Sequence, residues 1–297
     1  MGIVRSRLSR IKQSRLAWRW LFNWNRTLRF VMGDILNQSS NADLVNLRVE
    51  GIIVRRAETI FDKAGLLHLD AIIALVEDRM KEDEVQQVIR KGHSGSGRKN
   101  YYLQLFGKEF EEESPFIQIA LQPRLLSLVN GYMGMWSYLQ SVQVWLNFPT
   151  LGDARETQLW HRDDDDLMNV KVFIYLNDVD EQTGLFCFAP RTHPIGDLTI
   201  NVRTDESGRV SDTEMAAGVS PSRWKVCTGP AGTVILADTI GYHKGLKPIR
   251  GHRVLLMLHY TSGKPRYPSS LSLRGHGGRM MGGRETYLLG RDFSDGN

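Results

Sequence analysis

A His-x-Asp pair and a distant histidine are the residues of this sequence with the clearest chemical potential. His161 and Asp163 are separated by one residue, and His243 follows much later in the chain. Alternate residues of an extended strand point to the same side, so the pair would bring an imidazole and a carboxylate into one space. Two imidazoles and one carboxylate on one face of a metal leave its opposite positions open, which suits non-haem Fe(II). The spacing therefore predicts an iron site formed by His161, Asp163 and His243.

Other acidic and imidazole side chains compete for two of these positions. Within the acidic run 163–166, only Asp165 shares the parity of Asp163, and it lies one step further out, about 6.6 Å along a strand. We expect Asp164, Asp165 and Asp166 to form a solvated loop that could also repel anionic substrates or hold a cation. Three other histidines could replace His243 as the third ligand: His193, His252 and His259. We favour His243, which follows a strand and a turn, whereas His193 precedes Pro194 at a corner where histidine more often caps a turn.

Arg253 is the candidate that would hold the carboxylate of a cosubstrate. It begins an apolar strand ten residues after His243, and a guanidinium can grip a carboxylate through two parallel hydrogen bonds. Arg250 competes with it but precedes a glycine in a loop, where a surface salt bridge of small value is the simpler interpretation. Phe173 could form a wall of the same pocket, although core packing explains it equally well. Thr183 could donate a hydrogen bond there, although a threonine before glycine in a turn needs no such role.

On these residues and their flanks, the sequence resembles the phytanoyl-CoA dioxygenase family of Fe(II)/2-oxoglutarate oxygenases. The resemblance is carried by 160–194, with Thr183-Gly184-Leu185-Phe186 and the corner Ala189-Pro190-Arg191-Thr192-His193, and by 229–260. Segments 50–54 and 115–134 are similar to the N-terminal strand and helices of the family. Two departures affect the finer cosubstrate contacts: Arg191-Thr192 replaces the usual glycine and serine, and Gly245 stands where some members have serine.

The resemblance implies an enzyme that needs Fe(II), 2-oxoglutarate and O2, with ascorbate as a stimulant. Its expected reaction is hydroxylation of a small or carrier-bound organic substrate, with release of succinate and CO2. Asp163 disfavours a related halogenase, which would have a small residue in place of the carboxylate. A non-catalytic metal-binding jelly roll and a membrane-associated scaffold remain alternatives, and a cupin-type isomerase is disfavoured because its histidines usually lie closer together.

The pattern of apolar residues and turns predicts a mainly β protein with flanking helices, and specifically a double-stranded β-helix (jelly roll, cupin-like). Helical runs are expected at 70–90 and 115–130. Short β-rich segments separated by Gly, Pro, Asp and Asn follow at 138–148, 157–163, 170–177, 185–189, 197–203, 223–227, 232–237 and 252–261. Eight such strands fit two sheets that close over a ligand cavity. We divide the chain into a basic, Trp-rich extension (1–40), the oxygenase domain (41–274) and a Gly-rich tail (275–297), which is expected to run over the surface.

The charge of this chain is concentrated at its beginning. The net charge is +5, yet residues 1–33 contain eight Lys or Arg and no acid, so the rest carries 30 basic and 33 acidic residues, a net of −3. This distribution argues against a nucleic-acid cleft in the body of the protein. The basic, Trp-rich start could contact a membrane surface or a partner, or pack on the domain. Two cysteines without a secretory signal favour the cytoplasm.

Overall fold

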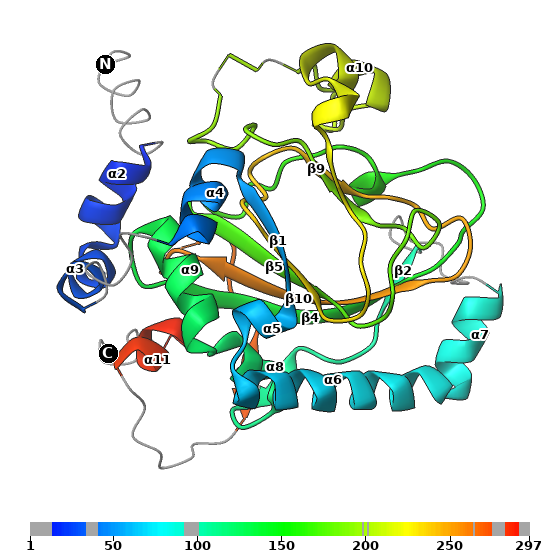
Figure 1. Cartoon of the computed structure of the whole chain (residues 1–297), viewed down its shortest axis with the longest axis horizontal. Coiled ribbons are helices and arrows are strands. Elements are labelled where there is room, and N and C mark those ends of the chain that lie inside the picture. Colours follow the sequence, from blue (N-terminus) through cyan, green and yellow to red (C-terminus); the bar gives the residue numbers. More distant parts are fainter. Residues whose placement is uncertain are drawn as a thin grey trace.

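The protein is built around a six-stranded antiparallel sheet, seen at the centre of Figure 1. The computed structural model describes residues 14–33, 41–91, 101–197, 199–200, 202–263, 265–274 and 283–290. The strands of the sheet, in spatial order, are β1 (Ile52–Arg56), β8 (Thr233–Ala237), β5 (Asn169–Tyr175), β10 (Arg253–Thr261), β4 (Tyr138–Asn147) and β2 (Tyr102–Gln104). Neighbours in space are mostly distant in sequence, so the sheet brings separate parts of the chain together.

A smaller antiparallel sheet faces the first one. Its strands, in spatial order, are β7 (Lys225–Cys227), β6 (Phe186–Phe188) and β9 (His243–Gly245). A parallel pair is formed by β3 (Glu109–Glu111) and β11 (Ser272–Arg274). The small sheet places the predicted third ligand, His243, at the start of a strand that pairs with β6. The facing antiparallel sheets and their helices confirm the mainly β architecture with flanking helices.

Helices cover the other face of the large sheet and its ends. In chain order the helices are α2 (Arg15–Ala17), η1 (Trp18–Phe22), α3 (Trp24–Gly33), α4 (Ala42–Glu50), α5 (Ala57–Ile60), α6 (Lys63–Lys81), α7 (Asp83–Lys91), α8 (Pro115–Ala120), α9 (Pro123–Met133), η3 (Glu156–Gln158), α10 (Asp212–Gly218), η4 (Pro221–Arg223) and α11 (Gly283–Leu288). Figure 1 shows α6 running along one side of the large sheet. The run expected at 115–130 forms two helices, because Pro123 begins α9 and the residue before a proline is biased away from helical angles.

The strands at the centre of the large sheet are buried on both faces, and alternate residues enter different cores. In β5, Val172 and Ile174 pack with the helices, whereas Phe173 and Tyr175 pack with the small sheet. In β10, Leu256 belongs to the helical core and its neighbours point to the small sheet. This alternation follows from the two-residue period of a strand. It gives the space between the two sheets its own set of side chains.

Two of the expected strands are absent. Residues 157–163 contain the 3-10 helix η3 and only isolated bridges, from Trp160 to Val210 and from His161 to His243. The described residues within 197–203 form turns and coil rather than a strand. The prediction of a strand at 157–163, around the His-x-Asp pair, was therefore wrong. A single bridge at His161 still fixes the segment, and Asp163 lies beyond it.

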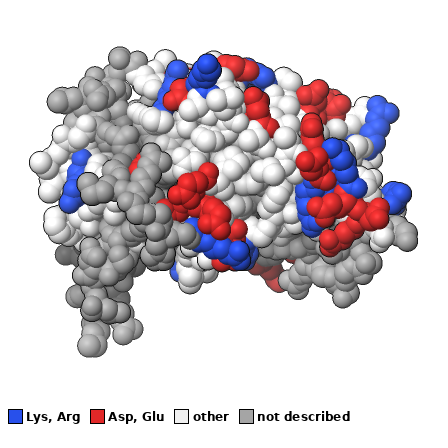
Figure 2. Space-filling model, turned by 90° about the horizontal axis from the view of Figure 1, so that it is seen from below, with Lys and Arg blue, Asp and Glu red and all other residues white. Residues whose placement is uncertain are grey.

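The two ends of the described chain lie on the same side of the molecule (Figure 1). Residues 14–33 pack on the body beside α9, and α11 follows the undescribed residues 275–282, with Leu288 buried. The remaining parts of the expected extension and tail, at 1–13, 34–40 and 291–297, lie outside the described residues. Among the described helices, none combines the length and apolar character needed to cross a bilayer. On the face shown in Figure 2, acidic and basic side chains lie interspersed rather than forming a basic patch.

Candidate metal centre

The three predicted ligands meet in one place between the sheets. Candidate ligand atoms of His161, Asp163 and His243 all lie within 4.8 Å of one another. Nε2 of His161 is 3.9 Å from one oxygen of Asp163, and Nε2 of His243 is 3.6 Å from the other. The two histidines are also paired through their backbones, since each N–H donates to the carbonyl of the other at 3.0 Å. Segments far apart in sequence are thus joined at the ligands themselves.

The hydrogen bonds of both rings leave Nε2 available for a metal. Nδ1 of His161 is 2.9 Å from the Leu159 carbonyl, and Nδ1 of His243 is 3.0 Å from the Gly241 carbonyl. A carbonyl only accepts, so each Nδ1 must carry the proton, and a neutral ring then has its lone pair on Nε2. Burial, followed by the neighbouring His243, lowers the pKa of His161 to about 3, and burial also lowers the pKa of His243. Both rings are therefore neutral, as metal ligation requires.

Asp163 stays ionised in spite of its burial. Burial alone would raise its pKa, but Lys171 and then the two histidines lower it below its usual range. The Lys171 ammonium on β5 lies 2.7 Å from Oδ2 of Asp163 and 3.3 Å from Asp165. The Asp163 backbone N–H donates to the Thr239 carbonyl at 2.9 Å. A carboxylate held charged and oriented in this way suits a divalent cation.

A tight turn at 238–241 supports two of the three ligands. Thr239 accepts the Asp163 N–H, and Gly241 accepts Nδ1 of His243. Asp238, fully buried, anchors the turn through the Ile240 N–H, at 3.1 Å. The Tyr132 hydroxyl of α9 donates to Asp238 at 2.5 Å, and the Arg15 guanidinium of α2 lies 3.3 Å from the same carboxylate. The N-terminal segment thus contributes a charge to the support of the metal centre.

Arg253 lies at the opposite end of the same cavity. Its side chain is nearly enclosed, at 5% exposure, and one amino group donates to the Asn147 side chain at 3.0 Å. Its Nε and second amino group are buried without a hydrogen-bond partner. Burial lowers the pKa of Arg253, partly offset by Tyr175. A Cβ at Gly245 would lie 2.9 Å from the guanidinium, so a glycine there leaves the arginine room.

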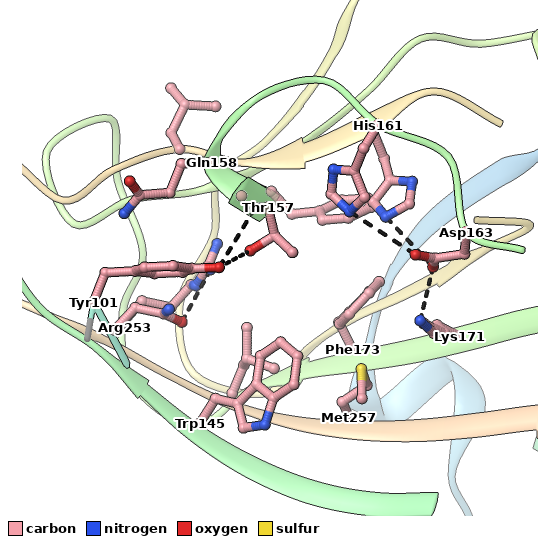
Figure 3. A pocket seen from close by; sticks show the side chains of 16 residues that line it. Tyr101, Trp145, Thr157, Gln158, His161, Asp163, Lys171, Phe173, Arg253 and Met257 are labelled. Carbon is pink, nitrogen blue, oxygen red and sulfur yellow. Dashed lines mark hydrogen bonds and ion pairs between the residues drawn. The ribbon is translucent and has the colours of Figure 1, made fainter. Parts of the chain in front are cut away.

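A continuous cavity joins the metal centre to Arg253. Figure 3 shows His161, Asp163 and Lys171 at one end, Arg253 and Tyr101 at the other, and Phe173, Trp145 and Met257 between them. The lining residues are Tyr101, Trp145, Asn147, Thr157, Gln158, His161, Asp163, Lys171, Phe173, Phe186, His243, Gly245, Leu246, Arg253, Leu255 and Met257. Phe173 contributes a wall and packs against Phe186, with ring centres 4.7 Å apart and the ring planes tilted by 36°. The cavity is apolar in the middle and charged at both ends.

Thr183 and Arg250 do not reach this cavity. The Thr183 hydroxyl accepts from the Asp180 N–H at 2.9 Å and lies 3.2 Å from the Asp180 carbonyl, so it closes its own turn. Arg250 is exposed in the neighbouring loop. Neither side chain lines the cavity around Arg253. The structure gives Thr183 a role in turn geometry, and its cosubstrate role stays a prediction without a supporting contact.

The competing histidines and acid are occupied elsewhere. His193 bonds to the Arg48 carbonyl at 3.0 Å, and His259 donates to the Asn169 side chain at 2.8 Å. Asp165 accepts from Lys171, and His252 lies on the loop that precedes β10. Among the described residues, the only group of three or more His, Cys, Asp or Glu side chains placed to hold a metal ion is formed by His161, Asp163 and His243.

Two residues of the site, Lys171 and Asn147, are not among the predicted ones, and only Lys171 had a signal in the sequence. Lys171 is the single charged residue of β5 and shares the parity of Phe173 and Tyr175, so alternation alone places it on the cavity side. A lysine on a strand face that is otherwise apolar needs an acid nearby, which here is Asp163. Asn147 had no comparable signal, because its contact with Arg253 depends on the pairing of β4 with β10.

Comparisons with solved structures relate this fold to non-haem iron enzymes. No protein-family model matches the sequence, and no curated protein matches it. The fold is similar to that of EctD from S. alaskensis in its apo form, with 19% identity and a TM-score of 0.51 over 80% of this chain and 82% of that one. It is also similar to the epimerase SnoN in complex with Fe3+, alpha ketoglutarate and nogalamycin RO, with 16% identity and a TM-score of 0.50 over 81% and 95% of the two chains. The chain therefore has a fold shared with non-haem iron, 2-oxoglutarate-dependent enzymes.

Proposed function

We propose that this protein is an Fe(II)- and 2-oxoglutarate-dependent oxygenase. The observation that carries the proposal lies in one cavity: two neutral histidines and an ionised aspartate at one end, and a buried guanidinium with unpartnered donors at the other. The cluster fits a divalent metal with open positions. The unpartnered donors of Arg253 fit a carboxylate, because a buried cation is costly until an anion pairs with it. A dicarboxylate cosubstrate that spans the cavity would satisfy both ends.

Each end of the cavity has a separate task in this proposal. His161, Asp163 and His243 would hold the metal, and the turn at 238–241 keeps two of them in orientation. Arg253 would bind the far carboxylate of 2-oxoglutarate, with Phe173 as an apolar wall between the two ends. When bound, Fe(II) and 2-oxoglutarate would supply, with O2, the oxidation of a C–H bond: one oxygen atom would go to the substrate and the other to succinate, with release of CO2. The chain itself contributes placement and exclusion of water.

The finer assignment is to a hydroxylase similar to the phytanoyl-CoA dioxygenase family, with a double-stranded β-helix fold. It is supported by the sequence resemblance and by the two facing antiparallel sheets. The carboxylate of Asp163 in the cluster opposes a halogenase. The substrate class, a small or carrier-bound organic molecule, rests on the resemblance alone. SnoN, which has a similar fold, is an epimerase, so the product must be identified rather than assumed.

Metal and cosubstrate binding can be tested under anaerobic conditions. Addition of Fe(II) and then 2-oxoglutarate to the full chain should produce the visible charge-transfer band of a chelated keto acid. His161→Ala, Asp163→Ala and His243→Ala should each lose most of the band, whereas His193→Ala and His252→Ala should retain it. Each variant must be titrated, because changes around a ligand also weaken metal binding by roughly 10–100-fold. A folded triad variant that binds both molecules like the wild type would refute the site.

The reaction can be tested with a panel of candidate substrates under Fe(II), 2-oxoglutarate, O2 and ascorbate. Succinate formation that depends on a substrate, with a product heavier by one oxygen atom, would support hydroxylation. A product of unchanged mass and altered stereochemistry would show that the protein catalyses epimerisation rather than hydroxylation with the same cofactors. If the band forms but no substrate increases succinate formation above the uncoupled rate, the non-catalytic alternative gains support.

A further inference from the structure

The N-terminal segment carries an outward face that is unusually apolar. The exposed large hydrophobic side chains of 14–33 are Leu16, Trp20, Leu21, Trp24, Leu28 and Met32. These are six of the 15 such side chains in the described residues, although the segment is short. Trp24 and Met32 are 59% and 78% exposed. A concentration of this kind indicates an interaction surface rather than the scattered apolar residues that any protein exposes.

The opposite face of the same segment is fixed to the body of the protein. The Trp18 indole donates to the Ser262 hydroxyl at 3.0 Å, the buried Arg26 donates to the Ser137 carbonyl at 3.0 Å, and Phe30 is buried. Arg15 lies against Asp238, as described above. Because these contacts hold one face inward, the apolar residues are presented outward in a defined arrangement. They are not free to turn into the core.

Three of the exposed residues lie in line along α3. Trp24, Leu28 and Met32 are separated by four residues, which places them on one face of a helix. Together with Trp136 and Tyr287 they line a groove between α3 and α11. Figure 1 shows α2, α3 and α11 on the same side of the molecule. Half of the exposed apolar side chains of the segment therefore line this groove.

The segment that carries this surface has no acid in its sequence, although two of its arginines, Arg15 and Arg26, are turned inward. Residues 1–33 contain eight Lys or Arg and no acid, and Arg29 is exposed beside the groove with its guanidinium over Tyr287. From the apolar face and the basic segment that carries it, we propose that this surface docks the protein on an anionic lipid bilayer. Tryptophan and leucine would enter the interfacial zone while arginines contact the headgroups. The fixed inward face would orient the body relative to the membrane.

The same charge makes a second copy of the chain a poorer partner. Two copies that met through this surface would bring two acid-free basic segments together, and like charges in contact are unfavourable. A bilayer instead supplies both an apolar layer and negative headgroups. Tryptophan is enriched at membrane interfaces because its ring combines an apolar body with a polar N–H. The two exposed tryptophans fit that environment.

The proposal can be tested by sedimentation of the full chain with vesicles. Phosphatidylcholine vesicles are compared with vesicles that also contain phosphatidylglycerol, at low and at high salt. The triple variant Trp24→Ser/Leu28→Ser/Met32→Ser removes exposed side chains outside the metal site. A control triple variant, Leu67→Ser/Leu151→Ser/Ile249→Ser, removes three apolar side chains elsewhere that are more than half exposed. The anaerobic charge-transfer band, measured on every variant, confirms that folding and cosubstrate binding are intact.

We expect the wild type and the control triple variant to bind the anionic vesicles and to be released by salt. The α3 triple variant should bind at least about tenfold more weakly, because three large apolar side chains no longer leave water. The proposal would be overturned if the α3 triple variant bound the anionic vesicles as tightly as the wild type. It would also be overturned if the wild type bound phosphatidylcholine vesicles as tightly as those that contain phosphatidylglycerol. A concentration-dependent dimer that the α3 variant abolishes, without vesicle binding, would replace the bilayer with a second copy.

Discussion

The two regions on either side of the metal centre each bury an arginine, but with different surroundings. Arg15, in the N-terminal region, lies 3.3 Å from the buried carboxylate of Asp238 and 3.3 Å from the Tyr132 hydroxyl. Arg253, at the far end of the cavity, donates to the Asn147 side chain and forms no ion pair with any acid among the described residues. The protein thus pairs the charge of Arg15 with an acid of its own, whereas the charge of Arg253 has no such partner.

This difference separates a structural cation from a binding cation. A buried ion pair has already met its desolvation cost within the fold, so removal of one partner destabilises the protein. A buried guanidinium without an acid destabilises the fold and strengthens binding of an anion that can reach it. The same residue type therefore serves stability on one side of the cavity and recognition on the other. Four predictions test this contrast.

The largest effect is expected at Arg15. Arg15→Met leaves Asp238 buried without its cation and should lower the free energy of unfolding by about 3–5 kcal/mol, measured by urea denaturation. The dissociation constant of 2-oxoglutarate for the folded fraction should change little. The double variant Arg15→Met/Asp238→Asn should recover part of the loss, because neither charge remains. A loss below about 1 kcal/mol would make Arg15 an ordinary surface arginine.

Arg253→Met should show the reverse pattern. The free energy of unfolding should stay the same or increase, since a buried charge without an acid is removed. Affinity for 2-oxoglutarate should fall at least about 100-fold, because charge-assisted hydrogen bonds of roughly 1.5–3 kcal/mol each are lost. Fe(II) binding should remain, as the two ends of the cavity are separate. Anaerobic titration of the charge-transfer band measures both affinities, and a clear loss of stability would contradict the contrast.

Arg253→Lys should have an intermediate effect on 2-oxoglutarate affinity and tests how far the two-donor geometry of the guanidinium matters beyond its charge. An ammonium keeps the charge but cannot form two parallel hydrogen bonds with a carboxylate, so 2-oxoglutarate affinity should fall roughly tenfold. Arg250→Lys is the matched control in the neighbouring loop and should bind like the wild type. If the control is impaired and Arg253→Lys is not, the cosubstrate is bound outside the cavity described here.

Thr183→Ala should have the smallest effect. The hydroxyl closes the Asp180 turn, so its loss should lower the free energy of unfolding by about 1 kcal/mol or less. The dissociation constant of 2-oxoglutarate should stay within about twofold, since the side chain lies outside the cavity. Parallel denaturation and binding titrations measure the two quantities. A tenfold loss of affinity would return Thr183 to the binding region.

The sequence alone determined which residues were candidates for the metal and cosubstrate sites. His161, Asp163, His243 and Arg253 could be chosen because residue type, local parity and distance from an apolar strand are local properties. The predicted strand around His161 failed, because one long-range bridge, rather than a ladder, holds that segment.

Only the tertiary structure decided which charges are paired. The contact of Arg15 with Asp238 joins residues at distant positions, and the isolation of Arg253 depends on every element that packs around it. The orientation of each imidazole also depends on a backbone carbonyl: that of Leu159 for His161, and that of Gly241, in the turn at 238–241, for His243. Local pattern specifies which side chains a strand or helix can present. Whether a buried charge meets a partner depends on the pairing of remote segments, and no local pattern records that pairing.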